Sequence, residues 1–291
     1  MPPRKHRIVK SKRGLIEVHS AVALFGLAGL FGRWLPFSPL LIVLGRVTFA
    51  SLALGVYLAV RRSDLRRLVR ESGFLLVVLG VVLAAHWAAF FEAVQVSSVA
   101  VGLLAYACFP VFTVILEPLL LAERLDAANL GLAGLCLAGV AFIVPRFKPS
   151  DLVFRGVLWG LLSGLAFAFL AVYNRRLSQR HSAPAVAFVE DLTAAVLLSP
   201  ILFFRAAALD GRSLGLLAAL GVFCTAGAHT LFIHGMRTVK AQTASIISSL
   251  EPVYGIALAF WLLGDQPTPR TLAGGAVILG AVAAISLRKK P

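Results

Sequence analysis

The chain has 291 residues, of which 59% are hydrophobic and only 14% are charged, and its mean hydropathy is +0.89. Soluble domains carry about a quarter of charged residues, so this composition excludes a water-soluble fold and places the surplus apolar surface in lipid. The net charge of +15 is divided among short segments between apolar runs, which fits lipid headgroups and not a single nucleic-acid-binding patch. We therefore expect a multi-spanning membrane protein. Its expected partner is the lipid bilayer, and it is not expected to bind nucleic acid.

Ten apolar runs follow one another along the chain, each close to the ~20 residues that a membrane-spanning helix needs. Only helices and closed barrels satisfy the backbone in lipid, and barrel strands would be shorter and alternating, so the runs predict an all-α membrane protein. No convincing cleavage site follows the first run, which we expect to be retained as a span. In chain order the predicted spans are Leu15–Trp34, Pro39–Val60, Phe74–Gln95, Ser98–Leu121, Asn129–Val144, Phe154–Leu177, Pro184–Phe204, Leu214–Met236, Ala241–Gly264 and Thr271–Leu287.

Lysine and arginine determine the predicted orientation. If the N-terminus is inside, the inner segments hold 20 of the 28 lysines and arginines and the outer segments hold 7. Because cytoplasmic loops carry the excess of positive charge, both termini are predicted to be cytoplasmic. Residues 1–14 and 288–291 would then be basic cytoplasmic tails, and residues 147–153 a periplasmic linker.

The two halves of the chain are weakly similar to each other. A shift of 142 residues places Pro110 on Pro252 and Trp87 on His229. Five helices per repeat is an odd number, so the second copy would enter the membrane from the opposite side. Inverted repeats of this kind are typical of transporters, whose substrate site lies near the midplane between the halves.

Three segments carry a family resemblance. "LIVLGRVTFASLAL" (41–54), "VSSVAVGLLAYACFPVFTVILEPLLLAERL" (96–125) and "VKAQTASIISSLEPVYGIALAFWLLGDQPTPRTLAGGAVILGAVA" (239–283) resemble the drug/metabolite transporter superfamily, EamA type. The resemblance implies ten helices in two five-helix units, here 15–146 and 154–287. It also implies a carrier, commonly an exporter of amino acids or related metabolites in the bacterial inner membrane. The second unit ends in Asp265-Gln266 where the family pattern has Glu-Arg.

Glu251 and Pro252 interrupt the predicted ninth span near its middle. An ionisable group inside lipid is costly unless it is paired or hydrated, so Glu251 is a candidate proton carrier or a partner for a substrate ammonium group. The alternative is a protonated glutamate that hydrogen-bonds a neighbouring helix. Pro252 removes a backbone donor and is expected to kink the helix and free carbonyl groups toward a cavity.

The eighth span carries His229 and His234, which are five residues apart and therefore project from different faces. Only a short loop separates this span from the ninth, so a contact between His229 and Glu251 is geometrically feasible. Histidine titrates near neutral pH, so the pair would be able to relay a proton. A hydrogen-bonded structural histidine is the alternative.

Aromatic and imidazole groups in two other spans are candidates for substrate contacts. His86 lies near the middle of the third span, and Trp87 would supply a flat apolar wall, although aromatic residues in spans more often serve packing. Tyr106 and Tyr254 flank Pro110 and Pro252, respectively, and are candidate hydroxyl contacts.

Two further charged residues occupy matching places in the repeat. A shift of 145 residues places Arg46, in the second span, on Asp191, in the seventh, where Glu190 precedes it. Arg46 needs a carboxylate or carbonyl partner. The two charges are interpreted either as groups that gate the two ends of the carrier or as contacts that hold helices together.

These features favour a secondary carrier for a small molecule, coupled to protons or another gradient. No phosphate-binding GxxxxGK[ST] loop is present, so ATP coupling is not expected. The alternatives are a divalent-metal or cationic drug transporter and an intramembrane lipid-modifying enzyme, but no metal-binding or nucleophile motif supports the enzyme. The three cysteines show no CxxC spacing, and neither a disulfide nor a cofactor or metal site is expected. Small residues in 272–284 fit packing within the protomer or against a second copy in a homodimer.

Overall fold

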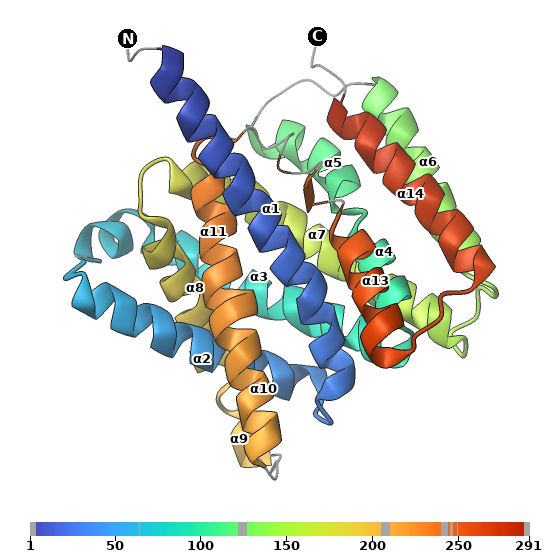
Figure 1. The fold of residues 1–291 in the computed structure, drawn as a ribbon, viewed down its shortest axis with the longest axis horizontal. Coiled ribbons are helices and arrows are strands. Elements are labelled where there is room, and N and C mark those ends of the chain that lie inside the picture. Colours follow the sequence, from blue (N-terminus) through green and yellow to red (C-terminus); the bar gives the residue numbers. More distant parts are fainter. Residues whose placement is uncertain are drawn as a thin grey trace.

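The computed structural model of the protein describes residues 4–63, 65–121, 127–204, 210–239, 244, 247–248 and 250–287. These residues form helices joined by short connections, with no strand among them. Figure 1 shows one bundle in which the N-terminal end of α1 and the C-terminal end of α14 lie at the same end. The helices are α1 (Arg4–Trp34), α2 (Pro39–Val60), α3 (Arg66–Val96), α4 (Val99–Tyr106), α5 (Phe109–Leu121), α6 (Ala127–Ile143), α7 (Leu152–Ser178), α8 (Ala183–Leu198), α9 (Ile201–Phe204), α10 (Gly211–Gly221), the π-helix η1 (Val222–Gly227), α11 (Ala228–Gly235), α13 (Glu251–Leu263) and α14 (Pro269–Leu287).

The helices have the length and composition of membrane spans. Seven segments in the described part of the chain are long and apolar enough to cross a membrane, and three shorter apolar helices cover Leu130–Ile143, Glu251–Leu263 and Pro269–Ala284. Each of these segments overlaps one of the ten predicted spans. The predicted all-α architecture of ten membrane helices is therefore confirmed.

The helix contacts repeat between the two halves. α3 packs on α7 in the same way that α1 packs on α11, because each pair joins the third helix of one half to the first helix of the other. The contacts of α5 with α7 and of α1 with α13 form a second equivalent pair, because the 142-residue shift places α5 on α13. α2 contacts its own counterpart α8, and α6 contacts its counterpart α14. These paired contacts are what two repeats related by a twofold axis produce.

Both proline-containing spans are interrupted ahead of the proline. α4 ends at Tyr106 and α5 begins at Phe109, so Pro110 lies in the first turn of α5. α13 begins at Glu251, and Pro252 follows in its first turn. Proline fits there because the first turn needs no backbone donor from it and its fixed φ suits the helix. Phe109 and Glu251 are equivalent positions under the 142-residue shift, so the break is a feature of the repeat.

In the predicted ninth span, Ala241–Gly264, the described residues 244 and 247–248 are helical, and a turn at Leu250 precedes α13. α13 covers only Glu251–Leu263, and most of residues 240–249 lie outside the described part of the chain. Glu251 therefore lies in the first turn of a helix, and Pro252 does not kink a longer one. The physical reason is that proline clashes with the preceding turn and, with its missing donor, ends the helical hydrogen-bond pattern at that point.

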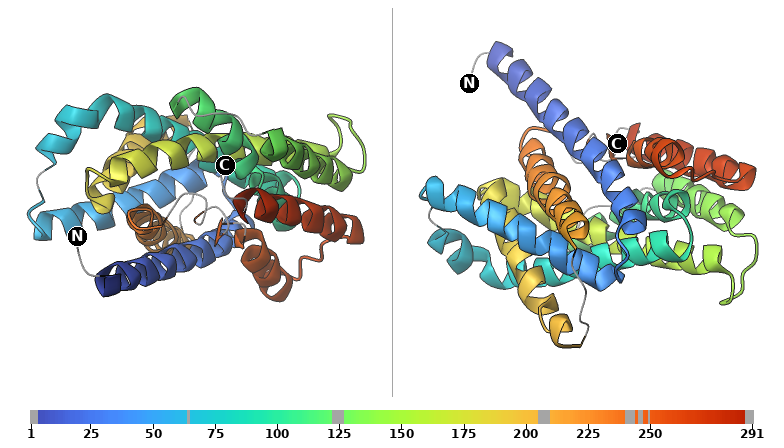
Figure 2. Two further views of the ribbon diagram at one scale, coloured as in Figure 1. Left: turned by 90° about the horizontal axis from the view of Figure 1, so that it is seen from above. Right: turned by 60° about the horizontal axis from the view of Figure 1, so that its bottom comes forward.

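α6 and α14 pack closely beside the rest of the bundle (Figure 2). Small residues allow this approach, since a Cβ atom added at Gly274 would lie 2.9 Å from the carbonyl oxygen of Gly139. The Arg270 side chain at the start of α14 donates hydrogen bonds to the carbonyl oxygens of Phe142 and Val144 at the end of α6. The two helices therefore run antiparallel, and Arg270 satisfies carbonyl groups that the end of α6 leaves free.

Candidate functional site

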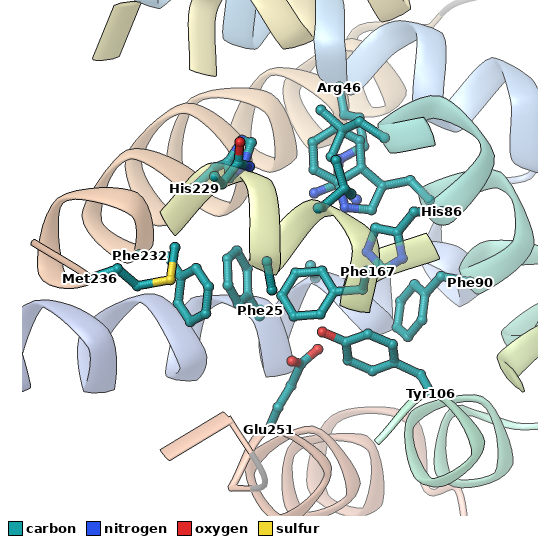
Figure 3. Close-up of a pocket in the computed structure, with 16 residues that line it drawn as sticks. Phe25, Arg46, His86, Phe90, Tyr106, Phe167, His229, Phe232, Met236 and Glu251 are labelled. Atoms are coloured by element: carbon teal, nitrogen blue, oxygen red, sulfur yellow. The ribbon is translucent and has the colours of Figure 1, made fainter. Parts of the chain in front are cut away.

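A pocket of about 40 Å³ lies inside the bundle, between helices of both repeats. This volume holds roughly three water molecules, so a larger solute requires the surrounding helices to move apart. Figure 3 shows aromatic side chains between an arginine on one side of the pocket and a glutamate on the other. The lining residues are Phe25, Ala28, Arg46, Leu83, His86, Trp87, Phe90, Tyr106, Phe167, Leu170, Ala171, Asn174, His229, Phe232, Met236 and Glu251.

Arg46, from α2, is the cation of the pocket and is only 1% exposed. Its guanidinium carbon lies 3.8 Å from the centroid of the Trp87 ring, and its Nε donates a hydrogen bond of 3.0 Å to Thr225 Oγ1. No carboxylate in the described part of the chain lies within the 4 Å of a salt bridge with it. The predicted carboxylate or carbonyl partner is therefore wrong, because a hydroxyl group and the face of an indole ring take its place.

The partner hydroxyl comes from the π-helix η1, which joins α10 to α11. Thr225 Oγ1 donates a hydrogen bond of 2.9 Å to the carbonyl oxygen of Leu220, five residues earlier. Short π-helical segments within longer helices are frequent at functional sites. Here the extra residue in the turn orients Thr225 toward Arg46.

Glu251 and Tyr106 face each other on the opposite side of the pocket. Figure 3 shows the Tyr106 hydroxyl directed at the Glu251 carboxyl group, with which it interacts. Glu251 is 4% exposed, and its Oε2 has no hydrogen-bond partner among the described residues. The breaks before α5 and α13 place the two side chains here, since Tyr106 ends α4 and Glu251 begins α13. On this side of the pocket, the Glu251 carboxyl group therefore has one oxygen that is free to bind a ligand.

His86 lines the pocket but already has local partners. Its Nδ1 lies 2.8 Å from Ser163 Oγ and 3.0 Å from the carbonyl oxygen of Ser163, on α7. The imidazole ring also packs against Phe167 and Tyr106, with centroids 5.2 and 5.5 Å away. This arrangement holds the ring in place and leaves Nε2 as its remaining polar atom.

His229 contacts a different glutamate from the predicted one. Its Nε2 lies 3.5 Å from Glu190 Oε2, on α8, and the same oxygen accepts a hydrogen bond of 3.3 Å from Asn174 Nδ2, on α7. The predicted His229–Glu251 contact is therefore wrong, although both residues line the same pocket. The reason is that α11 packs against α8 as well as α1, which brings the fully buried Glu190 to the back of the imidazole ring.

Other predicted site residues lie away from the pocket. Tyr254 is half-buried in α13 and packs beside Gly26 of α1. Asp191 is fully buried on α8, and neither of its carboxyl oxygens has a hydrogen-bond partner in the described residues. Pro110 and Pro252 serve the helix breaks described above. His234 pairs with Glu17 of α1, with 2.7 Å between Nδ1 and Oε2.

Hydrogen bonds join the helices beyond both ends of the pocket. Gln95, near the end of α3, donates to the carbonyl oxygens of Gly32 and Phe37 at 3.2 and 2.8 Å. Near the ends of α7 and α11, Arg237 donates to the carbonyl oxygens of Ser178 and His181 at 2.9 and 3.2 Å. The pocket thus lies between two sets of cross-helix contacts.

Sequence reasoning missed three polar residues that shape the site, Ser163, Asn174 and Thr225. Each is uncharged and lies inside an apolar run, where a single hydroxyl or amide has no distinctive pattern. The detectable signal is weaker: Asn174 is the amide residue within the predicted sixth span. Amides inside spans commonly bond across helices.

The histidines and acids do not converge on a metal. Among the described residues, no group of three or more histidine, cysteine, aspartate or glutamate side chains is placed to hold an ion. His86, His229 and His234 instead have separate partners. A membrane bundle of two helical repeats, with a largely apolar pocket between them that a few charged side chains line, is typical of a transporter.

The comparisons with known proteins agree with this class. The EamA-like transporter family matches the chain twice, over residues 12–144 and 154–287. The chain belongs to the EamA-like transporter family, within the drug/metabolite transporter superfamily.

Several relatives cover most of the chain. It is 32% identical to an uncharacterized transporter of Archaeoglobus fulgidus, over 81% of this chain and 84% of that protein. It is 30% identical to the pseudopaline exporter CntI of Pseudomonas aeruginosa, over 84% of this chain and 86% of that protein. A solved crystal structure at 20% identity matches 94% of this chain and 95% of its own with a TM-score of 0.68, which shows the shared fold.

Proposed function

We propose that this transporter is a secondary active exporter of amino acids or related small zwitterionic metabolites, coupled to protons. The observation that carries the proposal is the pocket itself, because the cation Arg46 and the acid Glu251 line the same buried space. A zwitterion carries the two complementary charges. The name of the Pseudomonas relative, an exporter of a small metabolite, supports the direction.

Arg46 is the proposed site for the carboxylate of the solute. Only its Nε has a hydrogen-bond partner among the described residues, so the two terminal nitrogens are available to a ligand. Arginine binds carboxylates through two parallel N–H donors, which adds geometric selectivity to the charge. Trp87 and Thr225 fix the plane of the guanidinium group, so little side-chain entropy is lost when the solute binds.

Glu251 is the proposed site for the ammonium group. Its free oxygen accepts a hydrogen bond from the solute, and Tyr106 holds the carboxyl group from the other side. The aromatic rings between the two charged groups, Phe167 and Phe232 among them, suit an apolar side chain.

Proton coupling follows from competition at the same carboxyl group. Burial makes an ionised glutamate costly, and no cation forms a salt bridge with Glu251 among the described residues, so we take Glu251 to carry a proton in the empty pocket. The ammonium group of a solute stabilises the ionised form and displaces that proton. When the two repeats expose the pocket alternately to each side, solute and proton exchange in opposite directions.

We propose that the protein lies in the bacterial inner membrane, with both termini in the cytoplasm. The excess of lysine and arginine on the side of the termini supports this orientation. A cysteine added to the C-terminal tail should react with a membrane-impermeant thiol reagent only after the cells are permeabilised. Reaction in intact cells would contradict the orientation.

The experiment uses the purified protein in liposomes loaded with a pH-sensitive dye. The standard L-amino acids are added with their methyl esters and N-acetyl derivatives, which lack the carboxylate and the ammonium group respectively. Riboflavin is included because a relative in Fusobacterium nucleatum is named a riboflavin transporter. We expect a pH change with free amino acids that both derivatives lose, and no such change with Glu251→Gln. Equal pH changes in the wild type and in Glu251→Gln would refute the role of Glu251.

A further inference from the structure

Two polar side chains line the pocket but bind neither end of the proposed zwitterion. Asn174 on α7 and His229 on α11 are 2% and 6% exposed, and both are lining residues. The proposed function assigns the solute carboxylate to Arg46 and the ammonium group to Glu251. A buried polar group is costly unless it is hydrogen-bonded, so recognition of the zwitterion alone does not explain why Asn174 and His229 lie at the pocket wall.

A glutamate behind the pocket determines how these two side chains are oriented. Glu190 on α8 is fully buried and does not line the pocket. Its Oε2 accepts a hydrogen bond of 3.3 Å from Asn174 Nδ2 and lies 3.5 Å from His229 Nε2. Both nitrogen atoms therefore point to one shared oxygen behind the pocket wall, and this makes Asn174 and His229 neighbours.

The remaining polar atoms of the two side chains are acceptors without a partner. Asn174 Oδ1 and His229 Nδ1 are buried, and neither has a hydrogen-bond partner among the described residues. An amide oxygen only accepts hydrogen bonds. Because His229 Nε2 faces an oxygen that already accepts from Asn174, we assign the ring hydrogen to Nε2, which makes Nδ1 an acceptor as well. Buried polar atoms are usually satisfied, so this pair of acceptors indicates a place for a donor.

A group with at least two N–H donors satisfies both acceptors at once. A primary amide has two such donors and an ammonium group has three, whereas a hydroxyl group has one. A carboxylate has no donor, and it would face both acceptors with the acid Glu190 behind them. The pair therefore selects for a nitrogen-bearing group and against a carboxylate.

The apolar lining fits the rest of a side chain that ends in such a group. Phe232 and Met236 follow His229 by about one and two turns of the same helical stretch, and all three residues line the pocket. Figure 3 shows both side chains on the same side of the pocket as His229. An apolar stem packs against this wall while its tip reaches the two acceptors.

We propose that Asn174 and His229 form a third recognition site, which binds the N–H donors of a primary amide or ammonium group at the end of the solute side chain. This inference rests on the proposed export of amino acids. It narrows the substrate class to amino acids such as glutamine and lysine. Glu190 does not touch the solute and is the positioning residue of the site.

The test compares matched solutes in liposomes that contain the purified protein. L-Glutamine and L-methionine have neutral side chains of similar length, and L-lysine differs from L-norleucine by its terminal ammonium group. All four are radiolabelled, and their half-saturating concentrations are measured. In at least one pair we expect the wild type to bind the nitrogen-bearing member about 5- to 30-fold more tightly, which is what two hydrogen bonds supply. The pair that responds shows whether the site takes an amide or an ammonium group.

Two variants each remove one acceptor. Asn174→Leu removes the amide, and His229→Phe removes Nδ1 but keeps a ring beside Trp87. Each should lower the preference at least about 3-fold, and His229→Phe replaces Asn174→Leu if that variant does not fold. Ser178→Ala is the matched control, because Ser178 is fully buried one turn further along α7, donates to the carbonyl oxygen of Arg175 at 2.8 Å and does not line the pocket. It should leave the preference unchanged.

Glu190 is tested by a conservative and a non-conservative variant. Glu190→Gln keeps an oxygen for Asn174 Nδ2 and His229 Nε2, so it should preserve the preference within each pair of solutes. Glu190→Leu removes that oxygen and should lower the preference as Asn174→Leu does. An equal preference in Glu190→Leu and the wild type would contradict the positioning role.

The outcomes separate the two proposals. If the wild type transports none of the standard amino acids, the proposed function and the third site are both wrong. If it transports amino acids but prefers neither nitrogen-bearing member of the two pairs, the third site alone is wrong, and the two acceptors only hold water. A preference that survives in both Asn174→Leu and His229→Phe, or that falls equally in Ser178→Ala, would also overturn the site.

Discussion

Thr225→Val tests whether the π-helix η1 holds the cation of the pocket. The substitution keeps the shape of the side chain but removes the oxygen that accepts the 3.0 Å hydrogen bond from Arg46 Nε. Arg46 is 1% exposed, so bulk solvent does not reach the donor that the substitution leaves unpaired. A buried donor left without a partner costs about 1–3 kcal/mol, although polar contacts within membranes average nearer ~0.6 kcal/mol. We expect the upper range because the donor is charged.

The assay is thermal unfolding of the purified protein in detergent, followed by tryptophan fluorescence. A loss of 1–3 kcal/mol corresponds to a fall in Tm of roughly 2–10 °C for a chain of this size. Thr48→Val is the matched control, because Thr48 donates only to the carbonyl oxygen of Leu44 on its own helix, at 2.7 Å. Equal falls in Tm for the two variants would refute the reasoning, since Thr225 would then act only as another helix residue.

Three further predictions concern packing and affinity. Copper–phenanthroline oxidation should join Cys108 to Cys136, whose Sγ atoms lie 3.2 Å apart; an unchanged count of free thiols would contradict the packing of the α4–α5 turn on α6. Gly274→Ala should lower the free energy of unfolding by about 1–3 kcal/mol. Gly280→Ala places its Cβ atom in open space and should stabilise α14 by up to about 1 kcal/mol. Destabilisation by both variants would refute the close contact of α6 and α14. Trp87→Leu removes the aromatic ring that contacts the Arg46 guanidinium group, and this cation–π contact contributes about 1–2 kcal/mol. The half-saturating solute concentration should therefore rise about 5- to 30-fold. Trp87→Phe keeps an aromatic ring and should show a smaller rise.

The ten helices are predictable from the sequence because hydropathy alone decides which segments reach lipid. What proline does within a span is less predictable. At Pro110 and Pro252 the sequence indicates only that a backbone donor is missing, which is compatible with a kinked helix and with a broken one. The structure breaks the helix at both positions, and the breaks bring Tyr106 and Glu251 face to face.

The partners of the buried polar residues could not be predicted for a different reason. The sequence shows that Arg46 needs a partner but does not show the π-helix that provides Thr225. One extra residue in a helix rotates everything after it by about 100°, and 222–227 has no proline or other marker of such a turn. The same rotation affects where His229 points. Counting residues from the end of its span therefore led to Glu251, while the structure brings His229 to Glu190.

The internal repeat in the sequence nevertheless indicates where the pocket lies. The 142-residue shift makes Trp87 and His229 equivalent positions, and in the structure their rings meet edge to face with centroids 6.1 Å apart. Two equivalent residues come this close only beside the axis that relates the halves, and both line the pocket. The repeat therefore determines where the pocket lies, while the differences between the copies determine its chemistry. An indole in one half supports a fixed cation, and an imidazole in the other contacts a buried acid.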